Sequence, residues 1–496
     1  MDSGEAQFDP YAALGIPQDA SQDLMELALD QIERRYKAQE RGKRGGVTPV
    51  HVKNARRAYE LLSNPNMLFA AMKHTREIDD RYYFNMKVTT SRTQLPVIDE
   101  PQILYLRVDF IPGEVTSNTA ERGNSNLNLT LVLDRSNSMH GARMDRVKGA
   151  ASQIIDNLTG DDVISVVAFS DRASVLVPAT KVRDKPALKA QVAMMTAYGS
   201  TEIYHGLSEG IRQNREFLDS KYVNHIILLT DGNTYGDEEQ CVQLASNASV
   251  EGIGISAMGL GTDWNDDFLD RLASSTGGSS QYIRNVNEVG NFINNHVRHL
   301  SSTFAERLRV VLQVADGVEI DSAFKIAPLP QPVEVNDNEI LLGILEGRRA
   351  TTAIIQLRLV PGLEEGLFNV CRVIGMGDVL LNEQPAYHTL HDVVADVTTM
   401  QFEEESNTAI LDALSRLALY RMQEQANDAI RRGEVEEATR RLEKLATRLL
   451  AIGQQALATH VLHEAHIVKT THMLSAEGKK TIKYNTRLLV NPQEGE

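Results

Sequence analysis

The pattern of hydrophobic and polar residues changes several times along the chain. Between Asn126 and about Asn285, the short apolar runs LTLVLD, DVISVVAFS, HIILLTDG and GIGISAMGLG alternate with stretches in which apolar residues recur every three or four positions. Unbroken apolar runs are typical of strands buried on both faces, and the longer period is typical of amphipathic helices. We therefore expect residues 126–298 to form a doubly wound, mostly parallel α/β sheet.

A different pattern flanks this central segment. ILYLRVDF, which begins at Ile103, alternates apolar and polar positions, as a strand does when one face is buried. Further strand-like runs, LRVVLQVA, NEILLGIL, TTAIIQLRLV and LFNVCRVIG, follow the central segment and are separated by turn residues. Residues 83–125 and 300–395 are predicted to form one antiparallel β-sandwich, beside which the central domain is inserted.

Both ends of the chain have helical spacing. SQDLMELALDQIERRYKAQE and HVKNARRAYELLSNP predict a helical module within residues 1–75. Residues 405–475 predict a C-terminal helical hairpin that is interrupted at Gly433. We assign residues 476–496 to a tail and expect its last five residues, PQEGE, to be disordered.

The N-terminal module contains two recognisable motifs, one from Tyr11 to Ile16 and the other from Ala58 to Pro65. They resemble the Tyr-x-x-Leu-Gly-Ile start and the Ala-Tyr-x-x-Leu-Ser-x-Pro end of the J-domain of cochaperones. Such domains stimulate a chaperone through a His-Pro-Asp tripeptide, and the corresponding loop here, QERGKRGGVTP, has none. The resemblance therefore implies a structural or docking role, not chaperone activation.

Composition narrows the class of protein. The chain has 496 residues, too many for one hydrophobic core, and its net charge of -16 disfavours binding to nucleic acid. No apolar run approaches the roughly 20 residues that span a bilayer. The two cysteines, Cys241 and Cys371, cannot form a disulfide framework. We expect a cytoplasmic protein without a membrane span.

Five oxygen-bearing side chains follow predicted strands or precede a predicted helix. Asp134, Ser136 and Ser138 follow the first strand of the central segment, Thr201 precedes a helix, and Asp231 follows HIILLT. The carboxyl ends of parallel strands meet at one edge of a sheet, so these side chains should converge there. Oxygen donors without histidine or thiolate suit a hard cation, with Mg²⁺ expected first and Mn²⁺ or Ca²⁺ as alternatives.

The charge of this set has a consequence for binding. Only the two aspartates are charged, so a cation held there stays electrophilic and favours a further oxygen from a partner carboxylate. An alternative is that Asp134 or Ser138 only caps the following helix, since Asp and Ser are common at helix starts.

The five positions match, in order, the metal-ion-dependent adhesion site (MIDAS) of von Willebrand factor type A (VWA) domains. That site consists of Asp-x-Ser-x-Ser, a distant Thr, and the Asp of an Asp-Gly pair after a strand. The similarity extends over the whole central domain, including LLTDG and GLGTDWND. The chain resembles bacterial VWA proteins with a flanking sandwich. This resemblance implies a domain that binds other proteins through a metal ion.

Three functions remain open at this point. The leading hypothesis is a non-enzymatic scaffold or adaptor whose metal captures an acidic side chain of a partner. The second is a regulator of a chaperone or an AAA+ ATPase, with an acidic segment of that partner at the metal. The third is a metal-dependent hydrolase, which is weaker because no nucleophile with a placed base emerges from the sequence.

Other motifs favour structural roles. DGNTYGDEEQCV has Tyr235 and Val242 at positions where an EF-hand needs ligands, so a loop and a helix start are expected. GIGISAMGLG lacks the third glycine of a dinucleotide fingerprint. Trp264 is expected in a core. A solvated or packing helix face is expected for three histidines spaced three residues apart, His460, His463 and His466.

Overall fold

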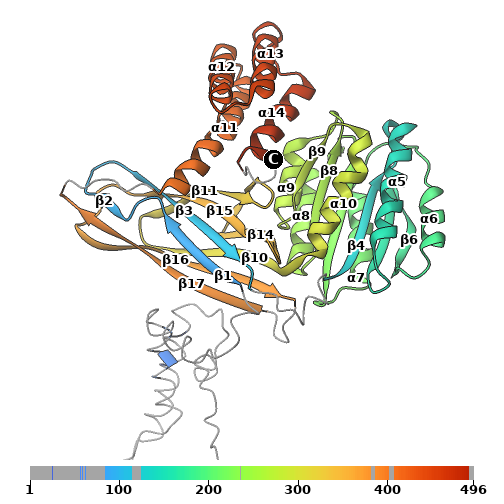
Figure 1. Cartoon of the computed structure of the whole chain (residues 1–496), viewed down its shortest axis with the longest axis horizontal. Helices are drawn as coiled ribbons and strands as arrows, with labels where there is room; N and C mark the ends of the chain where they lie inside the picture. Colours follow the sequence, from blue (N-terminus) through green and yellow to red (C-terminus); the bar gives the residue numbers. More distant parts are fainter. Residues whose placement is uncertain are drawn as a thin grey trace, which may run out of the picture. The chain divides into compact units, whose positions relative to one another are not determined.

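The protein is described by a computed structural model (Figure 1). It describes residues 84–113, 125–234, 236–380, 386–400 and 407–490. It also describes six residues nearer the N-terminus, all of them helical: Met25, Leu29, Arg56, Ala58, Tyr59 and Leu62. The rest of the J-like module predicted for residues 1–75 lies outside the described residues. The chain divides into two compact units, Met1–Arg81 and Tyr82–Glu496.

The central domain is built on a six-stranded sheet with the order β6-β5-β4-β7-β8-β9. All neighbouring strands are parallel except β6, which pairs antiparallel with β5 at one edge. The α/β fold predicted for this segment is confirmed. Its strands are β4 (Asn126–Asp134), β5 (Val163–Phe169), β6 (Ala173–Lys181), β7 (Tyr222–Thr230), β8 (Gly254–Leu260) and β9 (Ser280–Ile283).

Helices cover both faces of this sheet (Figure 1). Alternate residues of β4 serve the two faces: Leu131 and Leu133 pack into one core and Val132 into the other. The first core contains residues of α5 (Ala142–Asn157), α6 (Lys185–Ala193) and α10 (Val289–Ser301). The second contains residues of α7 (Ile203–Arg215), α8 (Glu238–Val250) and α9 (Asp266–Ser274). Two short 3₁₀ helices, η3 (Asn137–Met139) and η4 (Val286–Glu288), complete the domain.

Residues on both sides of the central domain form two further sheets, here called the two-sheet domain. Strand β3 precedes the central domain and β15 follows it, yet they pair from Phe110 with Thr351 to Gln102 with Leu359. The two sheets share one hydrophobic core. One sheet contains β1 (Asn85–Thr90), β3 (Gln102–Ile111), β15 (Thr351–Leu359), β11 (Val318–Ala327) and β12 (Gln331–Val333). The other contains β13 (Val335–Asn336), β14 (Glu339–Glu346), β10 (Thr303–Val314), β16 (Gly366–Val379), β17 (Ala386–Thr398) and β2 (Gln94–Pro96).

Residues 407–490, the described part of the C-terminal helical domain, contain four helices, where the sequence predicted a hairpin and a tail. They are α11 (Thr408–Arg431), α12 (Val435–Ala451), α13 (Gln455–Thr471) and α14 (Ala476–Leu488). Gly433 follows α11 with a φ of 77°, the left-handed conformation that commonly ends a helix. The prediction of a tail from residue 476 was wrong for α14, and PQEGE lies outside the described residues. The tail prediction failed because the buried positions of α14 include lysines and an arginine, which carry no apolar pattern.

These buried cations attach α14 to α9 of the central domain. Lys483 Nζ lies 2.7 Å from Asp266 and 2.9 Å from Asp270, and its side chain is only 2% exposed. Arg487 Nη2 lies 2.6 Å from the same Asp270 carboxylate. Burial opposes the ionisation of Asp266, but the charges of the neighbouring lysines outweigh it and lower its pKa. The cluster joins the C-terminal helical domain to the central domain through paired, ionised groups.

Trp264 completes this attachment. Its ring packs beside Gly259, where any side chain would collide with it, and its Nε1 donates a 2.7 Å hydrogen bond to the carbonyl oxygen of Gly261. Lys480 Nζ lies 4.2 Å from the centre of the ring, and Tyr484 of α14 packs against it. The core role expected for Trp264 is confirmed.

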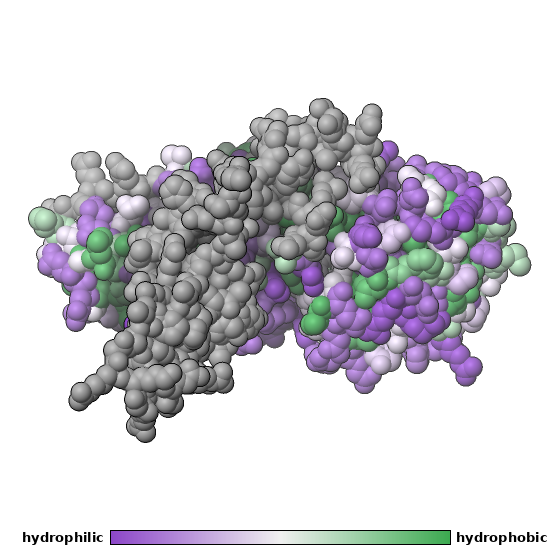
Figure 2. All heavy atoms as spheres, turned by 90° about the horizontal axis from the view of Figure 1, so that it is seen from below, coloured by the Kyte–Doolittle hydropathy of each residue, from purple (hydrophilic) through white to green (hydrophobic). Residues whose placement is uncertain are grey.

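Among the described helices, none combines the length and the apolar character needed to cross a bilayer. On the face shown in Figure 2, hydrophobic residues of the described part are interspersed with hydrophilic ones.

Candidate metal centre

Asp134 is the last residue of β4, and both oxygens of its carboxylate are held by hydrogen bonds. The backbone N–H of Ser136 donates to Oδ1 at 2.8 Å, and the hydroxyl of Thr230, at the end of β7, donates to Oδ2 at 2.7 Å. The residue is fully buried. These contacts fix the carboxylate at the carboxyl edge of the sheet.

The two serines that follow form a chain of contacts to the neighbouring strand end. The hydroxyl oxygens of Ser136 and Ser138 lie 2.9 Å apart, and Ser138 donates a 2.6 Å hydrogen bond to Oδ1 of Asp231. Ser136 and Asp231 are buried, whereas Ser138 is exposed. The cluster therefore opens to solvent at Ser138.

Thr201 reaches the same edge from the start of α7. A methyl group built on Gly232 would lie 3.1 Å from Thr201 Oγ1, so this hydroxyl faces the turn that follows β7. Asp237 joins the two segments, because its carboxylate accepts hydrogen bonds from the backbone N–H of Tyr204 and from the Thr234 hydroxyl. Four of the five predicted residues are connected by hydrogen bonds or a close hydroxyl contact, and the fifth, Thr201, lies against the turn that carries Asp231.

The helix-capping alternative does not explain this arrangement. The residue that precedes α5 is Gly141, and no side chain of the described residues caps this helix. Asp134 accepts the backbone N–H of Ser136, just before η3, but it also accepts the Thr230 hydroxyl from the neighbouring strand, and Ser138 donates to Asp231.

The two carboxylates of the cluster are close and poorly hydrated. Burial raises the pKa of Asp134, and the charge of Asp231 acts in the same direction. A cation placed among these oxygens would relieve both effects. Two carboxylates and three hydroxyls fit a hard divalent ion, so the residues present suit Mg²⁺ or its relatives.

Two arginines near the cluster were missed by the sequence analysis. Arg143 of α5 forms a 2.6 Å ion pair with Oδ2 of Asp231. The guanidinium of Arg135 lies 4.2 Å from the ring centre of Tyr198, a side chain that is 46% exposed. Their spacing gives no motif, because each contact crosses from one loop or helix to another.

Other candidate sites are weaker. In the described part of the chain, no group of three or more His, Cys, Asp or Glu side chains is placed to hold a metal. His463 and His466 are exposed and His460 is half-buried, in line with the expected solvated or packing face. In the EF-hand-like stretch, Tyr235 lies outside the described residues and α8 begins at Glu238.

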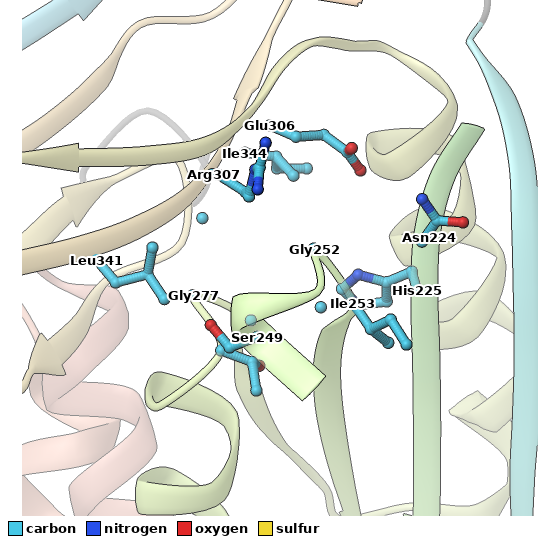
Figure 3. Close-up of a pocket in the computed structure, with 14 residues that line it drawn as sticks. Asn224, His225, Ser249, Gly252, Ile253, Gly277, Glu306, Arg307, Leu341 and Ile344 are labelled. Atoms are coloured by element: carbon cyan, nitrogen blue, oxygen red, sulfur yellow. The ribbon is translucent and has the colours of Figure 1, made fainter. Parts of the chain in front are cut away.

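A small cavity lies between the central domain and the two-sheet domain (Figure 3). Figure 3 shows the side chain of Glu306 directed toward Asn224, and burial raises the pKa of this carboxyl to about 8. The cavity measures about 30 Å³. That volume has room for roughly two water molecules and is too small for an organic ligand.

Comparisons with known proteins agree with this architecture. The sequence model of the von Willebrand factor type A domain matches residues 128–300, and that of the "Sll0103-like, C-terminal alpha-helical domain" matches residues 408–492. A relative, "Uncharacterized protein sll0103" of Synechocystis sp., is 29% identical over 336 residues, which cover 64% of this chain and 78% of that protein.

Two solved structures share the fold over most of the chain. A von Willebrand factor type A protein from Catenulispora acidiphila has a TM-score of 0.65 at 16% identity and covers 82% of this chain and 98% of its own. The ArnB paralog VWA2 from Sulfolobus acidocaldarius has a TM-score of 0.51 at 14% identity and covers 82% and 99%. Residues 128–300 thus form a VWA domain, followed by a C-terminal helical domain of the Sll0103-like type.

Proposed function

We propose that this chain is a metal-dependent protein-binding module, a scaffold or adaptor whose central domain captures a carboxylate of a partner protein. VWA domains generally mediate protein interactions and typically bind a divalent metal at a MIDAS. The observation that carries the proposal is the cluster itself. Its oxygens converge at one edge of the sheet, with two buried carboxylates inside and the exposed residue Ser138 at the mouth.

The five residues would contribute two kinds of oxygen ligand to a cation. Asp134 and Asp231 supply the negative charge, and Ser136, Ser138 and Thr201 supply neutral oxygens. When bound, a divalent cation provides a Lewis-acid site for one more oxygen ligand from outside. Mg²⁺ is the preferred ion, since carboxylate, hydroxyl and water oxygens are its usual ligands, and Mn²⁺ or Ca²⁺ are alternatives.

The surroundings of the cluster favour binding over catalysis. Among the described residues, no histidine or lysine forms a hydrogen bond with Ser136 or Ser138, and the group that accepts the Ser138 hydroxyl is the Asp231 carboxylate, which is needed as a metal ligand. The basic side chain that touches the cluster, Arg143, is paired with Asp231. We therefore propose a non-enzymatic role.

Partner capture by the full chain, immobilised in buffer with Mg²⁺ or with a chelator, tests this function. The wild-type chain should retain specific proteins from a lysate of its source organism in Mg²⁺ and release them in chelator. Asp134→Ala should retain none of them, whereas Asp145→Ala, on the exposed face of α5, should behave as the wild type. Equal retention by Asp134→Ala and the wild type would contradict the proposal.

A further inference from the structure

Arg143 is placed to change the charge of the candidate metal centre. It lies in the first turn of α5, and its Nη1 is 2.6 Å from Oδ2 of Asp231 and 3.2 Å from the carbonyl oxygen of Ser138. The side chain of Arg143 is 38% exposed, whereas that of Asp231 is fully buried. One side of the Asp231 carboxylate thus meets a cation that reaches in from the rim.

The other side of the same carboxylate faces the cluster. Asp231 Oδ1 accepts the 2.6 Å hydrogen bond from Ser138, so this one carboxylate connects the guanidinium with the hydroxyl oxygens. A cation among those oxygens would feel attraction from Asp134 and Asp231, and also repulsion from Arg143. At these short distances, with one partner buried, such charge interactions are only partly screened by water.

We propose that Arg143 sets the charge of this centre: by pairing with Asp231 it weakens the binding of a divalent cation and leaves that cation more attractive to an incoming carboxylate. The inference rests on the proposed function, because it concerns the same site. It gives Arg143 a role in ligand selection that is separate from holding the metal.

A purely structural role for this ion pair predicts the opposite effect of an Arg143 substitution on metal affinity. If Arg143 only positioned Asp231, its loss would misplace a ligand and metal binding would weaken. If Arg143 acts through its charge, its loss removes repulsion and metal binding becomes tighter. The sign of the change in affinity therefore separates the two roles.

The experiment uses the full chain and Mn²⁺, with calorimetry to measure the dissociation constant. Arg143→Gln should bind Mn²⁺ on the order of tenfold more tightly than the wild type, a change equal to about 1.4 kcal/mol. Arg143→Lys, which keeps the charge, should bind Mn²⁺ as the wild type does. Arg146→Gln, on the exposed face of the same helix, is the matched control and should also bind as the wild type.

Acetate then serves as the probe for the incoming carboxylate. With each protein saturated with Mn²⁺, the paramagnetic broadening of the acetate methyl signal reports how much acetate binds at the ion. Arg143→Gln should broaden this signal several-fold less than the wild type. Unchanged or weaker Mn²⁺ binding by Arg143→Gln, a Lys variant that behaves like the Gln variant, or undiminished acetate broadening would each overturn the inference.

The Mn²⁺ titrations distinguish a failure of the inference about Arg143 from a failure of the proposed metal centre. If the wild type binds Mn²⁺ but Arg143→Gln binds it no more tightly, the inference is wrong and the proposed metal centre stands. If neither protein binds Mn²⁺ at millimolar concentration, both the centre and the inference are wrong.

Discussion

The hydroxyl of Thr230 donates a 2.7 Å hydrogen bond to Oδ2 of Asp134, so the last residue of β7 fixes the carboxylate at the end of the neighbouring β4. Both residues are fully buried. If the Asp134 side chain turned away, its Oδ2 would lose this hydrogen bond and become a buried, unsatisfied oxygen, which is energetically unfavourable. Thr230 is thus a positioning residue for the candidate centre, although it is not one of the five predicted ligands.

Replacement of Thr230 tests this role. Thr230→Val keeps the shape of the side chain but removes the donor, so the free energy of unfolding should fall by about 1–3 kcal/mol, as for other buried groups that lose a partner. Mn²⁺ affinity should fall as well, because the carboxylate is less well held. Thr230→Ser keeps the hydroxyl and should retain Mn²⁺ affinity. Urea unfolding and calorimetric titration measure the two effects, and unchanged Mn²⁺ affinity in Thr230→Val would argue against positioning.

Gly232→Ala should weaken metal binding without removing a ligand. The added methyl group would lie 3.1 Å from Thr201 Oγ1, so this hydroxyl must shift by a few tenths of an ångström. Gly149→Ala is a suitable control, because a methyl group there meets nothing within 4 Å. We expect the Mn²⁺ dissociation constant of Gly232→Ala to be several-fold higher than that of the wild type, and that of Gly149→Ala to be unchanged. Equal dissociation constants for the two variants would show that Thr201 is not a ligand.

The charge cluster between α9 and α14 gives a prediction about stability. Lys483→Met removes the buried cation that contacts both Asp266 and Asp270, while Arg487 stays paired with Asp270. Loss of one member of a buried ion pair typically costs about 3–5 kcal/mol, and we expect a loss near the lower end of that range. Lys479, whose side chain is 30% exposed, contacts the same Asp266, and Lys479→Met should cost at most about 1 kcal/mol. Urea unfolding of the full chain compares the two. Similar losses in both variants would mean that burial of Lys483 does not matter.

A pair of buried histidines predicts how stability depends on pH. The rings of His225 and His296 lie 5.5 Å apart, and neither ring nitrogen of His296 has a hydrogen-bond partner among the described residues. Burial lowers the pKa of His225 from 6.5 to about 3 and holds that of His296 well below 6.5, where the nearby His299 and Lys325 also oppose its charging.

The direction of this pH dependence follows from whether the folded or the unfolded protein binds protons first as the pH falls. As pH falls below about 6.5, the unfolded chain takes up protons at both histidines while the folded protein does not. The free energy of unfolding should therefore fall between pH 6.5 and about 3, by up to about 1.4 kcal/mol per pH unit for each histidine. His296→Leu should lose less stability than the wild type between pH 7.5 and 5.5, whereas the exposed His463→Gln should match the wild type. Equal losses in His296→Leu and the wild type would refute this explanation.

Sequence reasoning located the candidate centre because its residues lie at strand ends. Asp134 and Asp231 each end an apolar run, and in a parallel sheet such ends must meet at one edge. Thr230 was missed because it reads as one more strand residue. Arg143 was missed because its contact with Asp231 joins residues far apart in sequence, and no periodicity encodes such a contact.

The same reasoning explains the error at the C-terminus. Hydrophobic periodicity detects helices that bury apolar side chains, and it succeeded for α12, where Leu442, Leu445 and Leu449 are buried. Helix α14 instead buries Lys480, Lys483 and Arg487 against a carbonyl and the carboxylates of α9. Such a face reads as solvent-exposed until its partners are known, so the segment was assigned to a tail.

Anomalous diffraction from crystals soaked in millimolar Mn²⁺ is the most direct measurement of the proposed metal centre. We predict an anomalous peak within bonding distance of the hydroxyl oxygens of Ser136 and Ser138, with Asp134, Thr201 and Asp231 around it, and no such peak in crystals of Asp134→Ala. Full soaking with no peak among these five side chains, or an equal peak in the variant, would contradict it.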